Sequence, residues 1–504
     1  MLKRVGAITA LIVLCSAHVG SPDAWYEGAA GPYHVTVQVQ TPGVVPGVAK
    51  VFARVQGQGV EQVTMQVNRY DAIASAPPPE LATPVGGDAG LYSASLWVMA
   101  GGSNSVTVNV SGALGSGKVV IPVVVVANRR LELDPRLGTA LSIVGLFLLV
   151  GLITIIGAAV RESGLPPGEQ PDGKRRTKAR IAMAASTAFL ALALFGGLTW
   201  WNAEDANFTA SIYKPLRASA VLSADKTILD LRISDSVWMR RNDTAWLSRH
   251  SASRWSPLIR DHGKLIHVFM IREPDLLAFA HVHPQTSDSV DFPIQLLPLP
   301  VGRYRVYGDI VHESGFTQTL TTTVDIPTAI ERGRQPGDAD DASYFASAPP
   351  NASRAVLEDG SVMTLQSGGR DIFAGTEAPL RFSVADKDGK PLVLEPYIGM
   401  AGHAVVTRDD GAVFVHLHPS GTISMASQMA IVMREPGDSI TGRLGRRLAA
   451  TDTSHATPQT PVAGEINFPY AFPQPGTYHM WVQVKHAGRI LTGAFALQVK
   501  AAKS

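Results

Sequence analysis

A histidine pattern occurs twice in this chain, and its residue types are those that bind transition metals. The stretch AFAHVHP ends at Pro284, and VFVHLHP ends at Pro419. Successive side chains of a β-strand alternate between its two faces, so both histidines of His-x-His point to the same side. Imidazoles gathered on one face suit copper, zinc or nickel. The repeated pattern therefore predicts a metal site.

The two patterns belong to an internal repeat, because residues 208–328 and 356–500 can be laid over each other. Each block continues to a Gly-x-Tyr and then to a last histidine. The chain has 14 histidines, and most other polar residues differ between the two blocks. The histidines that recur at matched positions are His267 with His403, His281 with His416, His283 with His418, and His312 with His486.

Hairpins in each block would bring these histidines together. Folding the second block about Asp410-Gly411 places His403 opposite the His416 to His418 segment, because Asp-Gly favours a tight turn. Folding the first block about REPD places His267 roughly across from Ala280 and His281. The last matched pair would then lie nearby. We expect a cluster of three or four histidines in each copy, with the better site in the second.

Methionines near the second cluster favour copper. Met400 lies three residues before His403, and Met425 follows His-x-His-Pro. Thioether and imidazole ligands together are typical of copper, especially Cu(I). Met429 and Met433 continue at helical spacing, and for them packing in a core is the simpler interpretation. Zinc is the alternative metal.

The histidines also have an interpretation without a metal. A single histidine on a strand is commonly half-exposed or bonded to a backbone carbonyl, and His-x-His-Pro can simply end a strand before a turn. The alternative is therefore that these side chains are structural. Duplication of the whole set favours the metal site, since duplicated cores need to keep only apolar residues.

The N-terminus predicts export. Lys3 and Arg4 precede an apolar run and a set of small residues, which is the pattern of a secretory signal peptide over residues 1–17. Cys15 is the only cysteine of the chain. Disulfides are therefore excluded, and a metal site must use histidine, methionine, carboxylate or backbone ligands.

Two later apolar segments predict a membrane hairpin. Residues 137–160 and 181–201 are each long enough to cross a bilayer as a helix. The alternative is a helical hairpin buried in a large domain. The basic loop 161–180 between them predicts a cytoplasmic position for that loop. The chain is then a multi-pass protein of the bacterial inner membrane, with extracytoplasmic N- and C-terminal domains.

The remaining chain reads as mainly β. Short alternating runs separated by Gly, Pro and Ser predict an N-terminal β-sandwich over residues 25–130, and two further sandwiches over the repeat copies. The Pro- and Asp-rich residues 329–353 between the copies predict a linker. The fold class is thus three exported immunoglobulin-like β-sandwiches and a two-helix transmembrane hairpin.

Several functions are excluded or disfavoured. The formal net charge is +2, and no platform of basic and aromatic residues occurs, so nucleic acid is not expected as a partner. The chain has no Gly-x-Ser-x-Gly elbow, phosphate loop or dinucleotide fingerprint. An enzyme is therefore not expected.

The second copy resembles a known kind of module. PYIGMAGHAVVTRDDGAVFVHLHP, followed by PGTYHMWVQVKHAGRI, is similar to exported bacterial YtkA-like and FixH-like modules. The resemblance covers residues 395–498 best and 260–325 less well, where DHGKLIH departs from Gly-x-x-Gly-His. It implies an immunoglobulin-like sandwich outside the membrane, engaged in copper handling or respiratory-complex assembly. It also supports His403, His416, His418 and His486 as site residues.

Two functions from different classes follow. The first is a membrane-anchored periplasmic protein that binds, stores or delivers copper and works with a copper-handling or respiratory-assembly membrane protein. The second is a structural or interaction protein without a metal, whose sandwiches dock a respiratory or transport complex in the membrane.

Overall fold

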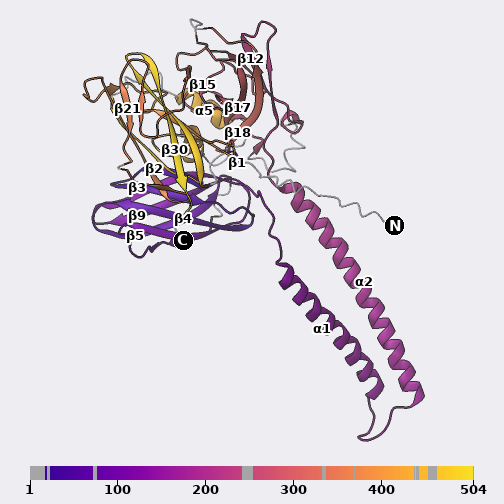
Figure 1. The fold of residues 1–504 in the computed structure, drawn as a ribbon. Coiled ribbons are helices and arrows are strands. Elements are labelled where there is room, and N and C mark those ends of the chain that lie inside the picture. Colours follow the sequence, from indigo (N-terminus) through magenta and orange to yellow (C-terminus); the bar gives the residue numbers. More distant parts are fainter. Residues whose placement is uncertain are drawn as a thin grey trace, which may run out of the picture. The chain divides into compact units, whose positions relative to one another are not determined.

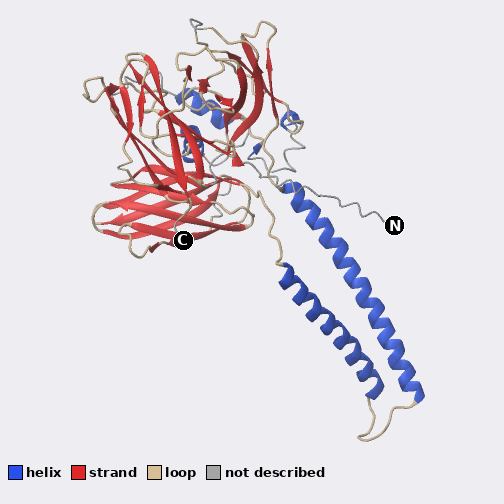
Figure 2. Ribbon diagram, in the orientation of Figure 1, coloured by secondary structure: helices blue, strands red, loops and turns tan. Residues whose placement is uncertain are grey.

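The computed structural model confirms a mainly β fold with a helical hairpin (Figures 1 and 2). It describes residues 18–19, 23–71, 76–240, 254–331, 336–367, 369–435, 438, 442–451 and 462–502. The predicted signal peptide lies outside these ranges. The chain divides into two units, of which residues 126–214 form one and the β domains form the other.

The N-terminal β domain is a sandwich of two antiparallel sheets with a core rich in valine. In β3, Val35, Val37 and Val39 are all buried, as strict alternation requires of a strand with one buried face. One sheet has the order β2 (Asp23–Ala30), β3 (Tyr33–Gln40), β4 (Gly47–Gln56), β8 (Leu91–Val98), β7 (Thr83–Pro84). The other has the order β10 (Gly115–Val125), β9 (Gly102–Gly112), β5 (Val60–Arg69), β6 (Glu80–Leu81).

The first repeat copy packs a long sheet against a short one around a single apolar core. In the long sheet β13 (Leu258–Ile259), β17 (Gly302–His312), β14 (His267–Glu273), β15 (Ala278–Val282) and β19 (Ala342–Phe345) are neighbours in that order, and β18 (Thr317–Ile326) also pairs with β17. The short sheet has the order β11 (Ala218–Leu222), β12 (Ile228–Ile233), β16 (Asp291–Gln295), and the 3-10 turn η2 (Trp238–Arg240) follows β12.

The second copy repeats this arrangement around its own core. Its main sheet has the order β1 (His18–Val19), β26 (Val413–Leu417), β25 (His403–Arg408), β29 (Gly476–His486), β30 (Arg489–Lys500), β22 (Ile372–Phe373). The opposing sheet has the order β20 (Arg354–Val356), β21 (Val362–Leu365), β23 (Glu377–Ala385), β28 (Glu465–Ala471), and β24 (Val393–Leu394) pairs with β27 (Val462–Ala463). Two short helices, α4 (Met425–Val432) and α5 (Arg443–Thr451), lie between β26 and β27 in the chain.

The segment between the copies is not a plain linker. Within residues 329–353, β19 pairs with β15, so that His281 lies opposite Ala342 in the ladder. The composition is rich in Pro, Asp and Ser, but the Tyr344 side chain is half-buried against the apolar cluster between the copies. Tertiary pairing overrides the turn-like composition here.

Each copy fixes its central strand with a tyrosine that bonds back to the chain. The Tyr304 hydroxyl donates to the Pro300 carbonyl at 2.7 Å, and the Tyr478 hydroxyl donates to the Gln474 carbonyl at 2.9 Å. Both tyrosines are those of the repeated Gly-x-Tyr, and both bond four residues upstream. A tyrosine of this kind is a hallmark of immunoglobulin-like sandwiches.

The two copies pack their main sheets against each other through matched aromatic side chains. Phe279 of β15 stacks on Trp481 of β29 with ring centroids 4.9 Å apart, and Phe414 of β26 stacks on Tyr307 of β17 at 3.8 Å. Phe279 and Phe414 each lie two residues before the first histidine of His-x-His. The contact is therefore reciprocal, as in a pseudo-twofold pair.

The other unit is a pair of long helices, α1 (Pro135–Glu162) and α2 (Gly173–Ser211) (Figure 1). Asp134 caps α1 and Pro135 begins it, which is the usual start of a helix. Both helices are long and apolar enough to cross a membrane. Apolar side chains such as Phe147 (75% exposed) face outward, so the hairpin is not a buried core element. Gly157 is buried against Met183, where a Cβ would clash.

Candidate metal centre

The repeated histidines converge on one place between the two copies. The first triad is His267, His281 and His283, and its ring centroids lie 5.5, 5.0 and 4.4 Å apart. The second triad is His403, His416 and His418, with matched separations of 5.3, 5.0 and 4.5 Å. The triads therefore have nearly the same geometry.

The triads also touch each other. The ring of His416 lies 5.4 Å from that of His267 and 5.8 Å from that of His281, and His281 lies 6.4 Å from His403. All six side chains are buried. The expectation of a separate cluster in each copy is therefore replaced by one composite cluster, because the sheets that carry the triads pack face to face.

Strand geometry brings each triad together, although in copy one the register differs by two residues from the predicted pairing of His267 with Ala280 and His281. In copy one, Phe269 pairs with His281, so His267 starts β14 beside the end of β15. In copy two, Val405 pairs with His416, and His403 starts β25. The two histidines of each His-x-His share a face because side chains alternate along the strand. The register therefore sets three imidazoles at one end of each hairpin.

A seventh histidine joins the cluster. His262 lies in a tight turn in which Asp261 and Lys264 form a bridge, with φ of 51° at His262 and 79° at Gly263. Positive φ is uncommon for a residue other than glycine, and it marks a constrained turn. The ring of His262 lies 5.9 Å from that of His403. Copy one thus supplies a side chain to the triad of copy two.

Sequence reasoning missed His262, although a signal for it existed. The turn Asp261-His262-Gly263-Lys264 matches Tyr397-Ile398-Gly399-Met400, which has the same bridge and the same positive φ values. Both glycines lie four residues before the first histidine of a triad. DHGKLIH departs from Gly-x-x-Gly-His at Ile266, which takes the place of Gly402, and the extra histidine of copy one precedes the first glycine of that pattern.

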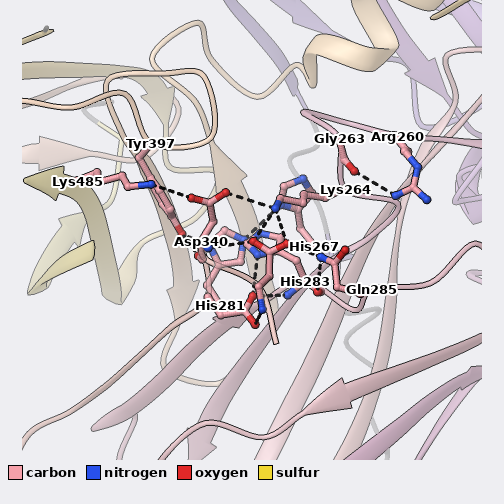
Figure 3. Close-up of polar contacts among 12 residues, drawn as sticks. Arg260, Gly263, Lys264, His267, His281, His283, Gln285, Asp340, Tyr397 and Lys485 are labelled. Carbon is pink, nitrogen blue, oxygen red and sulfur yellow. Dashed lines mark hydrogen bonds and ion pairs between the residues drawn. The ribbon is translucent and has the colours of Figure 1, made fainter. Parts of the chain in front are cut away.

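Polar side chains orient the first triad, as Figure 3 shows around His267, His281 and His283. Nδ1 of His283 lies 2.9 Å from Oδ1 of Asp341. Nδ1 of His281 lies 2.9 Å from Oε1 of Gln483 and 3.2 Å from the Tyr397 hydroxyl. Because these oxygens accept from Nδ1–H, each ring presents the lone pair of Nε2 to the cluster.

The second triad has related supports. Nδ1 of His418 lies 3.2 Å from the Ile423 carbonyl oxygen, and Nδ1 of His416 lies 3.5 Å from Oδ2 of Asp309. Asp309 pairs with His267 in the ladder, and Gln483 pairs with His403. Asp309 of copy one therefore contacts His416 of copy two, and Gln483 of copy two contacts His281 of copy one.

The N-terminal sandwich holds the chain that follows His418. The Trp25 backbone N–H donates to Oγ1 of Thr422 at 2.9 Å, and the Thr422 N–H donates to the Trp25 carbonyl at 3.0 Å. The Glu27 N–H also donates to the Ser420 carbonyl at 2.8 Å. These bonds fix the loop that supplies the Ile423 carbonyl to His418.

Acidic residues of the segment between the copies face the first triad. Nζ of Lys264 lies 2.6 Å from Asp338 and 3.3 Å from Asp340, and Lys485 also pairs with Asp340 at 3.2 Å (Figure 3). Beside them a pocket of about 400 Å³ is lined in part by His283 and Asp341. The first triad therefore adjoins a cavity with both polar and apolar walls.

Burial keeps five imidazoles of the cluster neutral. It lowers the pKa of His267, His281, His403 and His416 well below the ordinary value of 6.5, and neighbouring histidines lower it further. Burial lowers the pKa of His418 to about 4. Neutral imidazole is the form that binds metals.

Burial shifts the pKa of one carboxyl group beside the cluster, that of Asp309, upward. The Asp309 side chain keeps 24% of its surface exposed, and burial raises its pKa to about 7. A hydrogen bond from the Thr319 hydroxyl at 2.5 Å partly offsets this effect. Near neutral pH, Asp309 can therefore gain or lose a proton next to His416.

Nitrogen atoms of the cluster lack hydrogen-bond partners. Among the described residues, buried ring nitrogens without such a partner include Nε2 of His262, His267, His283, His403, His416 and His418, and Nδ1 of His403. A buried polar atom left unpaired costs about 1–3 kcal/mol. A metal ion is the one partner that accepts lone pairs from several imidazoles at once, so the donor set fits a transition metal.

Two of the matched histidines lie outside the cluster. Nδ1 of His312 lies 2.8 Å from the Ser256 carbonyl oxygen, and Nε2 lies 2.7 Å from Nε2 of Gln318. The His486 side chain is 31% exposed, and its Nδ1 lies 3.4 Å from Asp359. His312 and His486 each lie three residues after the residue that pairs with the first histidine of a triad in the sheet. Because side chains alternate along a strand, these two point to the opposite face of the sheet from that residue.

The methionines near the second triad are less buried than its histidines. Met425 is the first residue of α4 and is 40% exposed. Met400 is half-buried, and its backbone closes the turn with Tyr397. Met429 and Met433 pack against the apolar cluster between α4 and α5, as expected for core residues.

Comparisons with known proteins leave the function open. A family model described as a domain of unknown function, DUF8832, matches residues 237–328 and 354–501, which lie in the two repeat copies. No curated protein matches the chain.

Solved structures are similar only at a low level. An engineered protein shares 20% identity over 18% of this chain and 19% of its own, with a TM-score of 0.14. A bacterial ice-binding adhesin shares 9% identity over 91% of this chain and 92% of its own, with a TM-score of 0.14. A Salmonella alpha-2-macroglobulin shares 8% identity over 95% of this chain and 23% of its own, with a TM-score of 0.19. Likenesses this weak carry no argument.

The buried neutral histidines predict that the metal-free protein loses stability in acid. An unfolded histidine gains a proton below about pH 6.5, whereas the folded ones resist protonation down to about pH 4 for His418. In this range the unfolded state binds more protons than the folded state. As the pH is lowered, the free energy of unfolding therefore decreases by up to about 1.4 kcal/mol per pH unit for each such histidine. Asp309 opposes this trend, but as a single group.

Thermal melting of the metal-free full chain at pH 7.5 and pH 5 measures the effect. We expect a lower melting temperature at pH 5, and a smaller difference when His267 and His403 are both replaced by Gln. A melting temperature that is equal or higher at pH 5 would contradict the neutral state of the cluster.

Proposed function

We propose that this chain is a membrane-anchored protein that binds copper outside the cytoplasm, at the histidine cluster shared by its two repeat copies. The observation that carries the proposal is the set of buried ring nitrogens without hydrogen-bond partners, including Nε2 of His283, His416 and His418. Seven buried imidazoles packed together would be costly as core residues, because each hides a polar atom from water. Bound metal offsets that cost.

The ligand chemistry supports copper first and zinc second. Imidazole sites bind Cu, Zn and Ni, and the affinity for divalent ions is highest for Cu²⁺. Hydrogen bonds from Nδ1 to Asp341 and Gln483 are of the kind that orient metal-binding histidines. The resemblance of residues 395–498 to copper-handling modules agrees with this choice.

Binding, storage or delivery is the proposed role, rather than catalysis. The chain lacks the sequence motifs of common hydrolases and nucleotide enzymes. The pocket beside His283 offers a route by which an ion could enter or leave the cluster. A partner would be an extracytoplasmic membrane protein that supplies or receives copper.

The proposed location rests on the hairpin and on its charges. Lys174, Arg175, Arg176, Lys178 and Arg180 lie in the first turns of α2 and follow the short connection after α1. Positive charge next to membrane spans favours the cytoplasmic side. Both β regions would then lie outside the cytoplasm.

Metal uptake by the purified full chain in detergent tests the function. After incubation with CuCl₂ or ZnCl₂ and gel filtration, elemental analysis should find copper bound to the wild-type chain. Absence of both copper and zinc would leave the histidines as structural residues, and the interaction protein would be the remaining interpretation.

Two matched histidines separate ligands from bystanders. His416→Gln should lower copper uptake, whereas His486→Gln should leave it unchanged, because His486 pairs with Asp359 away from the cluster. Equal losses in the two variants, each with a melting temperature like that of the wild type, would place ligands outside the cluster. Elemental analysis of both variants in parallel gives the answer.

Topology is tested with reporter fusions. A reporter that is active only outside the cytoplasm should be active when joined after Ser504, and inactive when inserted between Glu162 and Gly173. An active cytoplasmic reporter after Ser504 would overturn the orientation.

A further inference from the structure

We propose that the cluster holds two metal ions side by side, one at the first triad and one at the second triad completed by His262. This inference rests on the proposed function and specifies the number and inequivalence of its sites. The donor atoms of His267, His281 and His283 all lie within 4.8 Å of one another. The same holds for the donor atoms of His262 with His403 and His418.

The number of donors exceeds what one ion can use. Zinc sites take four ligands at most in the resting state, and imidazole sites for similar ions are commonly built from three or four. One ion bound at either triad would leave at least three neutral imidazoles buried next to it. Two ions use the whole set and leave few nitrogen atoms unpaired.

Each triad also has its own buried carboxylate, and backbone N–H groups already donate to both of these carboxylates. Asp341, with 3% of its side chain exposed, lies 2.9 Å from His283 at the first triad. Asp261, with 6% exposed, lies 3.8 Å from Nε2 of His262 at the second. A buried carboxylate is costly unless a positive charge balances it. Two ions, each beside one carboxylate, provide that balance.

The two sites differ because the repeat has diverged at one turn. Copy one carries His262, which reaches the second triad, whereas the matching Ile398 of copy two has no donor for the first triad. Each site thus has three imidazoles whose donor atoms lie within 4.8 Å of one another. His416 lies next to both triads, because its ring is 5.3 Å from that of His403 and 5.4 Å from that of His267.

The first site is the one next to a cavity. His283 and Asp341 line the pocket of about 400 Å³. The first site should therefore exchange its ion with solution faster than the second.

Metal stoichiometry of the full chain in detergent tests the inference. After loading with ZnCl₂ and, separately, with CuCl₂, the wild type should retain two ions per chain. His283→Gln should retain one ion, and so should His262→Asn, for which asparagine is chosen because it tolerates the positive φ. The double variant should retain none. His34→Ala changes an exposed histidine paired with Glu27 and should retain two.

The outcomes separate this inference from the proposed function. A wild type that binds no metal overturns both. A wild type that binds one ion overturns the two-site inference alone. Loss of all metal in both single variants also overturns it, provided that their metal-free melting temperatures match that of the wild type.

A spectroscopic readout on the wild type avoids dependence on folding of the variants. Two neighbouring Cu(II) ions couple magnetically, so fully loaded protein should show a broadened or weakened electron paramagnetic resonance signal relative to half-loaded protein. A signal of isolated Cu(II) that only doubles on full loading would overturn the inference.

Discussion

Face-to-face packing of the two repeat sheets is the constraint on which the centre depends. Phe279 on Trp481 and Phe414 on Tyr307 form two reciprocal stacks in the apolar layer between the copies. The triads start at one end of that layer. A change in the angle or distance of the sheets would separate imidazoles that now lie 5 to 6 Å apart across the contact.

Reciprocity extends from packing to polar contacts. Gln483 supports His281, and Asp309 supports His416, although each belongs to the opposite copy. The Nε2 of Gln483 donates to the Thr492 hydroxyl at 3.3 Å, which keeps its carbonyl oxygen toward His281. Neither copy therefore orients its own His-x-His alone, and the histidine cluster lies between the two copies. Asymmetry enters at the turn of His262, where one half carries a donor and the other does not.

Much of this was predictable from the sequence, and the reasons for the rest are physical. Period-two alternation and the Asp-Gly turn predicted the hairpins that carry His403 and His416, and long apolar runs predicted the hairpin of α1 and α2. Alternation also turns His486 away, but sequence matching alone gave it the same weight as the triads. Convergence of the copies could not be predicted, because pairing between sheets depends on side chains far apart in sequence. Asp341 was hidden for a similar reason, since its segment has the composition of a linker and its position follows from β19, the next residues of the chain, which pair with β15.

The central claim is that metal binds between the two copies, to side chains of both. Anomalous X-ray scattering at the copper absorption edge, measured on crystals of the copper-loaded full chain, tests it most directly. We expect anomalous density within about 2 Å of ring nitrogens of the triads from both copies. Anomalous density confined to histidines outside the cluster, such as His34 or His486, would contradict this claim. A protein that takes up no copper, and whose crystals show no anomalous density, would contradict it as well.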